Sequence, residues 1–303
     1  MNNTQARLVN PVLTTAVQGI GDQALVGSTL FPRVDVSLRG GTTIVFNDTS
    51  DIDDDLIRAP GSSRKTYTPV YDGEDFAIIQ RSLAAKVPVE TEEEAQNGPG
   101  VSMSTVGISI VKKQLDKKLE VAQAKLARDA SRYATDSKRK LTGANKWSDP
   151  SSNPIQQISD AAEVIRAKTG KPCTELTLLL SAKAFNAIKN HPMVAERLKF
   201  SNQATLTTAY LASLLDIRSV VVGSATHKGE DIWGNDAILA YVAVGSLTNA
   251  EPSYGYTYTL RGTPAVLNGY FDESTDSWIY PVNVEATPVM AWQGAGFLFQ
   301  DCK

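Results

Sequence analysis

The sequence predicts an α+β fold organised around one long helix. Three observations indicate this fold class. Residues 104–133 contain no proline, and their apolar residues recur every three or four positions, as on one face of a helix. Residues 150–250 alternate between short helical patterns and short apolar extended patterns. The last part of the chain, from about residue 254, returns to extended patterns.

The composition is that of an ordinary globular protein. The chain has 303 residues, of which 42% are hydrophobic and 21% charged, so it can bury one large core or two smaller ones. A net charge of −3 does not favour a general nucleic-acid binder. Two cysteines imply no disulfide framework and fit a reducing compartment such as a cytoplasm. Neither a signal peptide nor a long apolar run is present, so we expect no membrane partner.

Residues 1–40 predict an N-terminal arm. Glycines and prolines interrupt this segment and leave room for one short helix near residues 14–20. The segment has too few apolar residues to form a core of its own. We therefore expect it to lie along another surface.

Residues 41–100 predict an extended loop in the form of a β-hairpin. Residues 42–46 and 76–89 are rich in β-branched and aromatic residues, as strands are, and the segment between them has almost no core residues. Such a segment is uncommon in a compact domain unless it serves a function. We expect a hairpin that projects from the body and contacts another chain, with a solvated insertion as the alternative.

The helix over residues 104–133 is expected to be the spine of the fold. At about 1.5 Å per residue it would span roughly 42 Å. Its apolar face carries Ile108, Val111, Leu115, Leu119, Ala122, Leu126, Ala130 and Tyr133. Its opposite face carries Lys112, Lys113, Lys117, Lys118, Lys125, Arg128 and Arg132. We expect the apolar side to pack in the core of the fold, and the basic side to face solvent and a negatively charged partner.

An α/β part is expected after a polar break at residues 136–153. Asn153 and Pro154 are the residue types that begin a helix, and Gly170 is the type that ends one, which predicts a helix over 154–169. Further helices are expected over 181–190 and 205–215, and buried strands over 175–180, 218–222 and 237–244.

The C-terminal part predicts four strands, over residues 256–260, 278–284, 288–292 and 296–300. We expect these strands to complete the sheet against which the spine helix packs. That subdomain would then be discontinuous in sequence.

The sequence contains no pattern typical of an active site. The two histidines, His191 and His227, have no cysteine or carboxylate cluster at metal-ligand spacing. A dinucleotide fingerprint, a phosphate-binding loop and a Gly-x-Ser-x-Gly motif are all missing from the sequence. We therefore expect no enzyme, no catalytic residue, no metal-binding residue and no cofactor.

One acidic stretch partly resembles a calcium-binding loop. Asp51, Asp53 and Asp55 have its opening spacing, but Leu56 and Ser62 stand where the loop needs Gly and Glu. A solvated acidic tip is the favoured interpretation, and a weak cation contact at an interface stays open.

Charge is distributed unevenly along the chain. Residues 48–94 contain twelve acidic and five basic residues, a net charge of −7, whereas residues 110–140 contain ten basic and four acidic residues, a net charge of +6. An acidic projection and a basic spine could attract each other between neighbouring copies, or both could be solvated faces. Asp116 and Glu120 are expected to form ordinary surface pairs with nearby lysines.

Several short segments, in their order along the chain, are similar to those of one known family. They are residues 143–150 (GANKWSDP) with Pro154-Ile155, 190–192 (NHP), 196–199 (ERLK), 211–216 (LASLLD), Val222-Gly223, 232–234 (IWG) and 252–257 (PSYGYT). Together with the order of arm, hairpin, spine helix, α/β part and C-terminal strands, they resemble the major capsid proteins of tailed bacteriophages. That family has the Hong Kong 97-type fold, which encapsulin shells share.

The resemblance implies a domain organisation and a function. It implies an N-terminal arm (1–40), an extended loop (41–100), a peripheral domain with the spine helix (101–149 and 271–303) and an α/β axial domain (150–270). The implied function is a head protein that self-assembles into pentamers and hexamers of an icosahedral shell around double-stranded DNA. The implied partners are many copies of itself, non-specifically bound DNA, a portal, and a separate scaffolding or decoration protein, because the chain has no room for a scaffold segment ahead of the arm. The implied location is the virion, assembled in the bacterial host cytoplasm.

The resemblance also implies roles for charged residues. The extended loop would contact neighbouring subunits through Asp51, Asp53, Asp54, Asp55, Arg58, Arg64 and Tyr67. The spine helix would face the lumen or DNA with Lys112, Lys113, Lys117, Lys118, Lys125 and Arg128. The loop over residues 224–235 of the axial domain would present His227, Lys228, Glu230 and Asp231. Nothing in the sequence supports a covalent crosslink through the loop lysines Lys65 and Lys86.

Two other functions remain as alternatives. An encapsulin-like nanocompartment would have the same fold and enclose a protein cargo. A soluble α/β enzyme is the second alternative, although the sequence offers it no nucleophile, metal cluster or phosphate loop.

Overall fold

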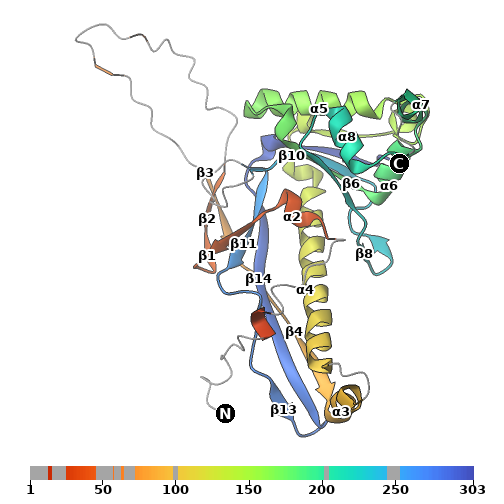
Figure 1. The fold of residues 1–303 in the computed structure, drawn as a ribbon. Helices are drawn as coiled ribbons and strands as arrows, with labels where there is room; N and C mark the ends of the chain where they lie inside the picture. The colour runs from red at the N-terminus through yellow and green to blue at the C-terminus, as the bar shows by residue number, and fades with distance from the viewer. Residues whose placement is uncertain are drawn as a thin grey trace.

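A computed structural model describes residues 13–15, 25–45, 57, 63–64, 72–97, 102–200, 205–243 and 253–303. The molecule has two parts (Figure 1): an upper lobe in which helices surround a small sheet, and an elongated lower lobe in which a long strand runs beside a long helix. The candidate contact residues Asp51, Asp53, Asp54, Asp55, Arg58 and Tyr67, and the loop lysine Lys65, lie outside the described residues.

A five-stranded sheet forms the centre of the upper lobe. Its strand order is β5 (Lys138–Lys140), β15 (Gly296–Gln300), β10 (Ala237–Tyr241), β6 (Leu176–Ser181) and β7 (Ser219–Gly223). The pairs β5–β15 and β6–β7 are parallel, and the two pairs of β10 are antiparallel. Every residue of β6 and β10 is buried, as predicted for the strands over 175–180 and 237–244. The prediction of a buried central strand over 218–222 is wrong, because β7 lies at the edge of the sheet and Ser219, Val221 and Val222 are only half-buried.

Four helices surround this sheet. They are α5 (Pro154–Thr169), α6 (Ala182–Lys189), α7 (Pro192–Phe200) and α8 (Thr208–Leu215). The predicted ends of α5 are confirmed, because the Asn153 side chain accepts a hydrogen bond from the Gln156 amide and Gly170 has the left-handed conformation with φ of 65°. Ser181 and Thr207 cap α6 and α8 in the same way.

The strand β14 (Ser277–Met290) organises the lower lobe. Three strands pair antiparallel with β14: β11 (Gly255–Leu260), β12 (Ala265–Val266) and β13 (Tyr270–Asp272). A fourth strand, β4 (Gln80–Pro88), pairs with β14 on the edge opposite β12 and β13. A single strand of 14 residues therefore replaces the two strands predicted over 278–284 and 288–292. The interruption expected at residues 285–287 is wrong, and the strand continues through Pro288 as it does through Pro281.

The spine helix α4 (Met103–Ala127) packs against β14 and β4, as Figure 1 shows. Ile108, Val111, Leu115 and Leu119 from its predicted apolar stripe are buried with Ala85, Val282, Val284 and Ala286. Ala124 and Ala127, near its C-terminal end, belong instead to the core of the upper lobe. One helix therefore takes part in both cores.

The spine helix ends earlier than predicted. Arg128 follows its last residue, and Asp129 accepts a hydrogen bond from the Ser131 amide, which starts a short 3₁₀ turn at Ala130–Arg132. Tyr133 is buried after this turn, and its hydroxyl donates to the Ala127 carbonyl oxygen at 2.7 Å. The apolar period continued to Tyr133 in the sequence because this tyrosine packs back on the helix end without belonging to the helix.

Two other expectations need correction. The strand over 296–300 was expected in the sheet of the spine helix, but β15 pairs with β10 and β5 in the upper sheet. The extended segment predicted to run to Val89 stops at Pro88, where α3 (Val89–Asn97) begins. Glu90 and Glu92 lie in the first turn of α3, where negative charge is favourable at a helix N-terminus.

The N-terminal segment joins the body of the same chain. α2 (Gly27–Leu30) precedes β1 (Arg33–Val36), which pairs parallel with β11. Leu30 and Phe31 are fully buried in the core of the upper lobe. Residues 26–36 are thus part of the folded subunit. The three described residues 13–15 are helical, and Thr14 and Thr15 fall within the range predicted for a short helix.

Replacing Gly223 with Ala should destabilise the upper lobe. A Cβ atom there would overlap the indole of Trp233, which is fully buried. Overpacking of this kind costs about 1–3 kcal/mol, so we expect a lower midpoint of chemical unfolding for the unassembled subunit. Gly40→Ala is the matched control, because its added methyl group would meet only the Phe76 carbonyl oxygen at 3.5 Å. Equal midpoints for the two variants would contradict the close packing at Gly223.

Candidate functional site

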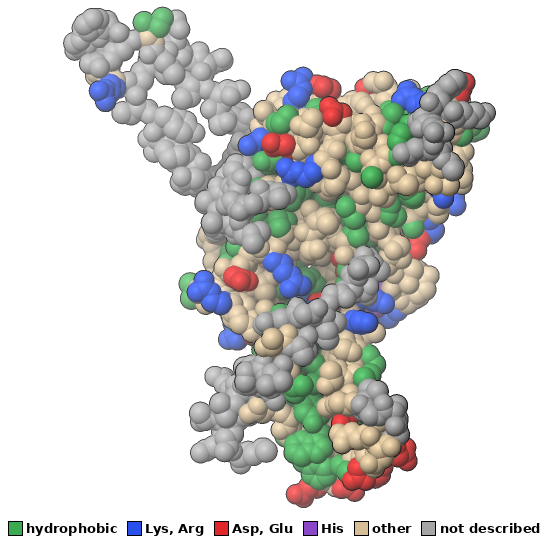
Figure 2. Space-filling model, in the orientation of Figure 1, with side chains coloured by type: hydrophobic (Ala, Val, Ile, Leu, Met, Phe, Trp, Pro, Cys, Tyr) green, Lys and Arg blue, Asp and Glu red, His purple; other side chains and the backbone are tan. Residues whose placement is uncertain are grey.

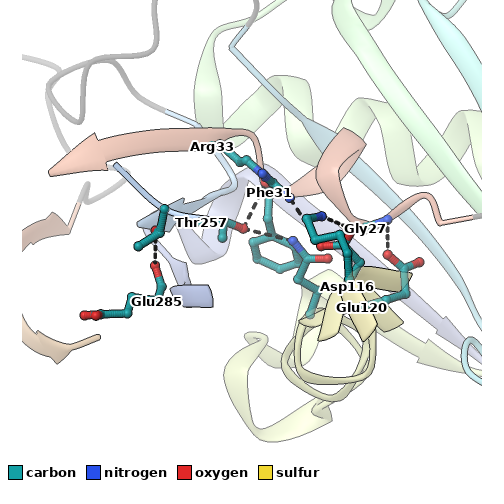
Figure 3. Close-up of polar contacts among 10 residues, drawn as sticks. Gly27, Phe31, Arg33, Asp116, Glu120, Thr257 and Glu285 are labelled. Carbon is teal, nitrogen blue, oxygen red and sulfur yellow. Dashed lines mark hydrogen bonds and ion pairs between the residues drawn. The ribbon is translucent and has the colours of Figure 1, made fainter. Parts of the chain in front are cut away.

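A buried carboxylate joins three distant segments of the chain. Glu120 lies on α4 between the residues that pack in the lower core and those that pack in the upper core. Its Oε1 accepts hydrogen bonds from the Val26 amide at 3.0 Å and the Trp233 indole at 2.7 Å, and its Oε2 accepts one from the Gly27 amide at 2.7 Å. Figure 3 shows Gly27 directly above Glu120 on the helix. The N-terminal segment, the spine helix and the upper lobe therefore meet at one side chain.

Neighbouring side chains complete this joint. Gln123 donates to the Thr257 hydroxyl at 2.9 Å, and that hydroxyl donates to the Phe31 carbonyl oxygen at 3.0 Å (Figure 3). A Cβ atom at Gly27 would overlap the side chains of Glu120 and Gln123. Only glycine can bring the backbone this close to the carboxylate.

Burial raises the pKa of the Glu120 carboxyl, while the hydrogen bonds from Val26, Trp233 and Gly27 act in the opposite direction. The expectation that Asp116 and Glu120 form ordinary surface pairs is wrong, because Asp116 pairs with the buried Lys112 and Glu120 itself is 2% exposed. The sequence could not show this, because the groups that satisfy its carboxylate come from 93 to 113 residues away.

A second joint lies at the end of the spine helix. Arg128 donates to the Asp236 carboxylate at 2.5 Å and to the Ile232 carbonyl oxygen at 3.2 Å, and the other oxygen of Asp236 accepts from the Asp301 amide. A polar cavity of about 620 Å³ opens beside these residues. Its other lining residues include Lys183, Glu230 and Asp231, and Lys183 pairs with Asp231 at 3.0 Å.

The base of the predicted hairpin is tied to the long strand. β2 (Gly40–Val45) and β3 (Asp72–Ala77) pair antiparallel and lead into and out of the candidate contact loop. Arg39, next to β2, donates through Nε and Nη2 to the Glu285 carboxylate of β14, at 2.7 and 2.9 Å. Arg39 lowers the pKa of Glu285 through these bonds and its charge. Arg64 is exposed, and it is the only one of the seven candidate loop residues that the structure describes.

The candidate residues on the basic face of the spine helix lie in different environments. Lys113, Lys118 and Lys125 are exposed, and Lys117 is half-buried. Lys112 is 3% exposed and pairs with Asp116 one turn further along the helix, so its expected position on the open basic face is wrong. Arg128 is half-buried and is held by Asp236. The basic face available to another molecule is therefore smaller than the sequence suggested.

The candidate loop residues 227–231 lie on a short hairpin. β8 (Thr226–His227) and β9 (Glu230–Asp231) pair antiparallel, and Lys228 and Gly229 form the turn with positive φ angles of 52° and 83°. His227 Nε2 lies 3.4 Å from Lys118 Nζ of the spine helix. His191, by contrast, is buried and bonds to Ser152 and to the Asp149 carbonyl oxygen.

The structure shows one surface that the sequence did not single out. Tyr270, Phe271 and Trp278 are 40–43% exposed at the far end of the lower lobe, and the Phe271 and Trp278 rings lie 5.5 Å apart. The acidic helix α3 lies at the same end (Figure 1), and Figure 2 shows hydrophobic and acidic side chains side by side there. Adjacent aromatic residues in the sequence were the available signal, but they also fit a buried strand.

The described part of the chain holds no cluster of three or more histidine, cysteine or acidic side chains that could bind a metal ion. It also lacks a helix that is both long and apolar enough to cross a membrane.

Comparison with known proteins finds similar chains along nearly the whole sequence. Residues 113–248 match the family described as Phage major capsid protein E. Over 273 residues, covering 87% of both sequences, the chain is 29% identical to the major capsid protein of Burkholderia phage BcepMu. The crystal structure of a phage-related protein from Bordetella bronchiseptica RB50 is 33% identical and superimposes over 98% of both chains with a TM-score of 0.84.

More distant likenesses concern the fold. The capsid of cyanophage P-SCSP1u is 10% identical and matches with a TM-score of 0.61, over 93% of this chain and 89% of that chain. The SrpI encapsulin of Synechococcus elongatus PCC 7942 is 9% identical and matches with a TM-score of 0.52, over 97% of this chain and 95% of that chain. These matches confirm the predicted α+β fold of the Hong Kong 97 type.

Replacing Glu120 with Gln should loosen the joint at the middle of the spine helix. A carboxamide has one acceptor oxygen, so its NH₂ group would face at least one of the three donors. An unsatisfied buried donor costs about 1–3 kcal/mol. We expect reduced unfolding stability of the unassembled subunit and faster hydrogen exchange at the Val26 and Gly27 amides. Glu163→Gln, on the exposed face of α5, is the control, and equal exchange in both variants would argue against the joint.

Replacing Arg39 with Gln should free the base of the hairpin from β14. Because the pKa of Glu285 is lowered in the folded state, the pair contributes at neutral pH and is lost as the pH falls through that lowered value. We expect lower protection of the β2 and β3 amides in the variant at neutral pH, and a smaller loss of protection on acidification. Arg139→Gln, an exposed residue of β5, should behave like the unmodified protein. Unchanged protection in the Arg39 variant would show that the pair does not hold the hairpin.

Proposed function

Because the chain belongs to the phage major capsid protein family, we propose that its copies form pentamers and hexamers of an icosahedral head around double-stranded DNA. The chain is a structural component of the phage capsid. The observation that carries the finer proposal is the extent of similarity, since 87% of the chain aligns with 87% of a major capsid protein. A chain that aligns over most of a major capsid protein can serve the same kind of wall.

The encapsulin-like alternative is not favoured. The likeness to the encapsulin is limited to the fold, at 9% identity, whereas sequence similarity reaches 29% with a phage major capsid protein. The third candidate function, a soluble enzyme, finds no support in the described side chains.

Two features of the subunit suit it to a shell wall. The joints at Glu120 and Arg128 bind the two lobes together through buried or half-buried polar side chains. A wall built from many copies needs subunits whose parts keep their relative positions while the contacts between copies form. The aromatic tip with Tyr270, Phe271 and Trp278 offers apolar surface for such contacts.

The proposed capsid function also suggests an assignment of the domains. The upper lobe would be the axial domain, around the five-fold and six-fold axes, and the lower lobe the peripheral domain. The strand pairing supports moving β11 into the peripheral domain and β15 into the axial domain, relative to the sequence boundary at residue 270. The segment between β2 and β3 would be the extended loop that contacts neighbouring subunits.

The further partners follow from the same function. The exposed lysines of the spine helix would face packaged DNA, and a portal and a separate scaffolding or decoration protein would complete the head. Assembly would take place in the cytoplasm of the bacterial host. We propose no catalytic activity for the chain.

Electron microscopy of the purified protein tests the proposal. Expression in bacteria, alone and with co-expressed phage assembly proteins, should give closed shells in the void fraction of a size-exclusion column. Nuclease-protected DNA in particles from infected cells would support the enclosed genome, and a co-purifying enzyme would instead support a compartment. A chain that stays monomeric under all of these conditions would contradict a shell function.

Deleting residues 51–63 should leave the subunit folded but impair its assembly, because the proposed contact loop would be lost. Circular dichroism would check the fold, and the ratio of shells to free subunits would measure assembly. An alanine substitution at Arg139, outside the loop, provides the control. Shells formed at normal yield and stability would remove the proposed role of this loop.

A further inference from the structure

The β8–β9 hairpin extends the basic face of the spine helix. The hairpin descends from the upper lobe beside α4 (Figure 1), and its tip brings His227 to Lys118 at 3.4 Å, across 109 residues of sequence. Lys228 is the next residue of the turn, and Lys117 precedes Lys118 on the helix. Two elements that are distant in sequence thus place cationic side chains in one cluster.

The charge of this cluster is not neutralised within the described residues. The pKa of His227 is lowered by desolvation and then by the positive charges of Lys118, Lys228 and Lys117. Glu230 pairs with His227 across the hairpin ladder but forms no ion pair among the described side chains, and Asp231 is held by Lys183. Lys117, Lys118 and Lys228 likewise have no carboxylate partner in the described part of the chain.

Several other lysines of the subunit are paired with carboxylates. Lys112 pairs with Asp116, Lys168 with Asp136, Lys183 with Asp231 and Lys140 with Asp301. Ammonium groups that have no carboxylate partner among the described residues, held near an imidazole by two separate elements, give a positive local potential. An anion that bridges them would relieve their mutual repulsion.

We propose that Lys117, Lys118, His227 and Lys228 form a single site that binds the phosphate groups of double-stranded nucleic acid. The proposal rests on the proposed function, in which the shell encloses DNA, and adds the hairpin tip to the surface that meets it. It also removes Lys112 and Arg128 from that surface, since both are engaged within the subunit.

The residue types favour a nucleic acid over a protein partner. Protein interfaces are enriched in aromatic residues and arginine and depleted in lysine. This cluster contains lysines and one histidine, which act as point charges and suit sequence-independent contact with a phosphate backbone. The acidic residues 51–55 of a neighbouring copy are the competing occupant, and the experiment distinguishes them.

The test compares two charge-matched triple variants of the subunit. Lys117→Gln, Lys118→Gln and Lys228→Gln remove the cluster, while Arg139→Gln, Lys189→Gln and Arg261→Gln remove the same charge from other exposed positions. Binding of a short fluorescent DNA duplex is measured by anisotropy at several salt concentrations, with circular dichroism as a check on folding. Each lost phosphate contact lowers the log–log salt slope by about 0.9. We expect the slope of the cluster variant to fall by about 2–3, and its affinity at low salt to fall at least about tenfold.

A single substitution tests the part played by the hairpin. A bound phosphate favours the charged imidazole, so DNA affinity should rise as the pH falls through the lowered pKa of His227. His227→Gln should remove most of this pH dependence while leaving the salt slope near that of the control variant. If His227 had only a structural role, His227→Gln would leave the pH dependence of DNA binding unchanged.

The outcomes separate this site from the general function. If the cluster variant binds DNA with the affinity and slope of the control variant, the site is overturned, even when particles still protect DNA. If the cluster variant binds DNA normally but fails to form shells, the cluster contacts a neighbouring copy, which also overturns the site. If particles from infected cells protect no DNA against nuclease, the enclosed genome itself is contradicted.

Discussion

Glu120 is buried at the point where the N-terminal segment, the spine helix and the upper lobe meet. A buried carboxylate is costly unless donors surround it, and here the Val26 and Gly27 amides and the Trp233 indole supply them. Each of these donors would in turn be unsatisfied without the carboxylate. The three segments therefore hold one another in place, because none can move away without exposing or orphaning a buried polar group.

The two cores depend on this connection. The helix α4 contributes Ile108, Val111, Leu115 and Leu119 to the lower core and Ala124 and Ala127 to the upper core. Glu120 occupies the turn between the two sets. The change of partner along one helix explains why its apolar stripe is long and why a polar residue interrupts it. It also explains how an elongated lobe stays aligned with a compact one.

Charge on the surface is distributed by tertiary contacts as much as by composition. The sequence placed seven basic residues on one helix face, but Lys112 and Arg128 are engaged by Asp116 and Asp236. The hairpin tip then adds His227 and Lys228 to the lysines that remain free of carboxylate partners within the described residues. The basic surface therefore covers less of the helix than the periodicity of the sequence indicates, but it extends sideways onto the β8–β9 hairpin.

Local sequence patterns predict the fold class, the helix caps at Asn153 and Gly170, the buried runs of β6 and β10, and the lower-core stripe of the spine helix. Each of these depends on residues close together in the chain, so periodicity and local hydrogen bonding reveal them. Three other features are visible only in the folded subunit: the sheet to which β15 belongs, the continuity of β14 across its prolines, and the role of Glu120. The partners of these elements lie tens to hundreds of residues away, and a local pattern carries no information about which distant groups will satisfy a strand edge or a buried charge.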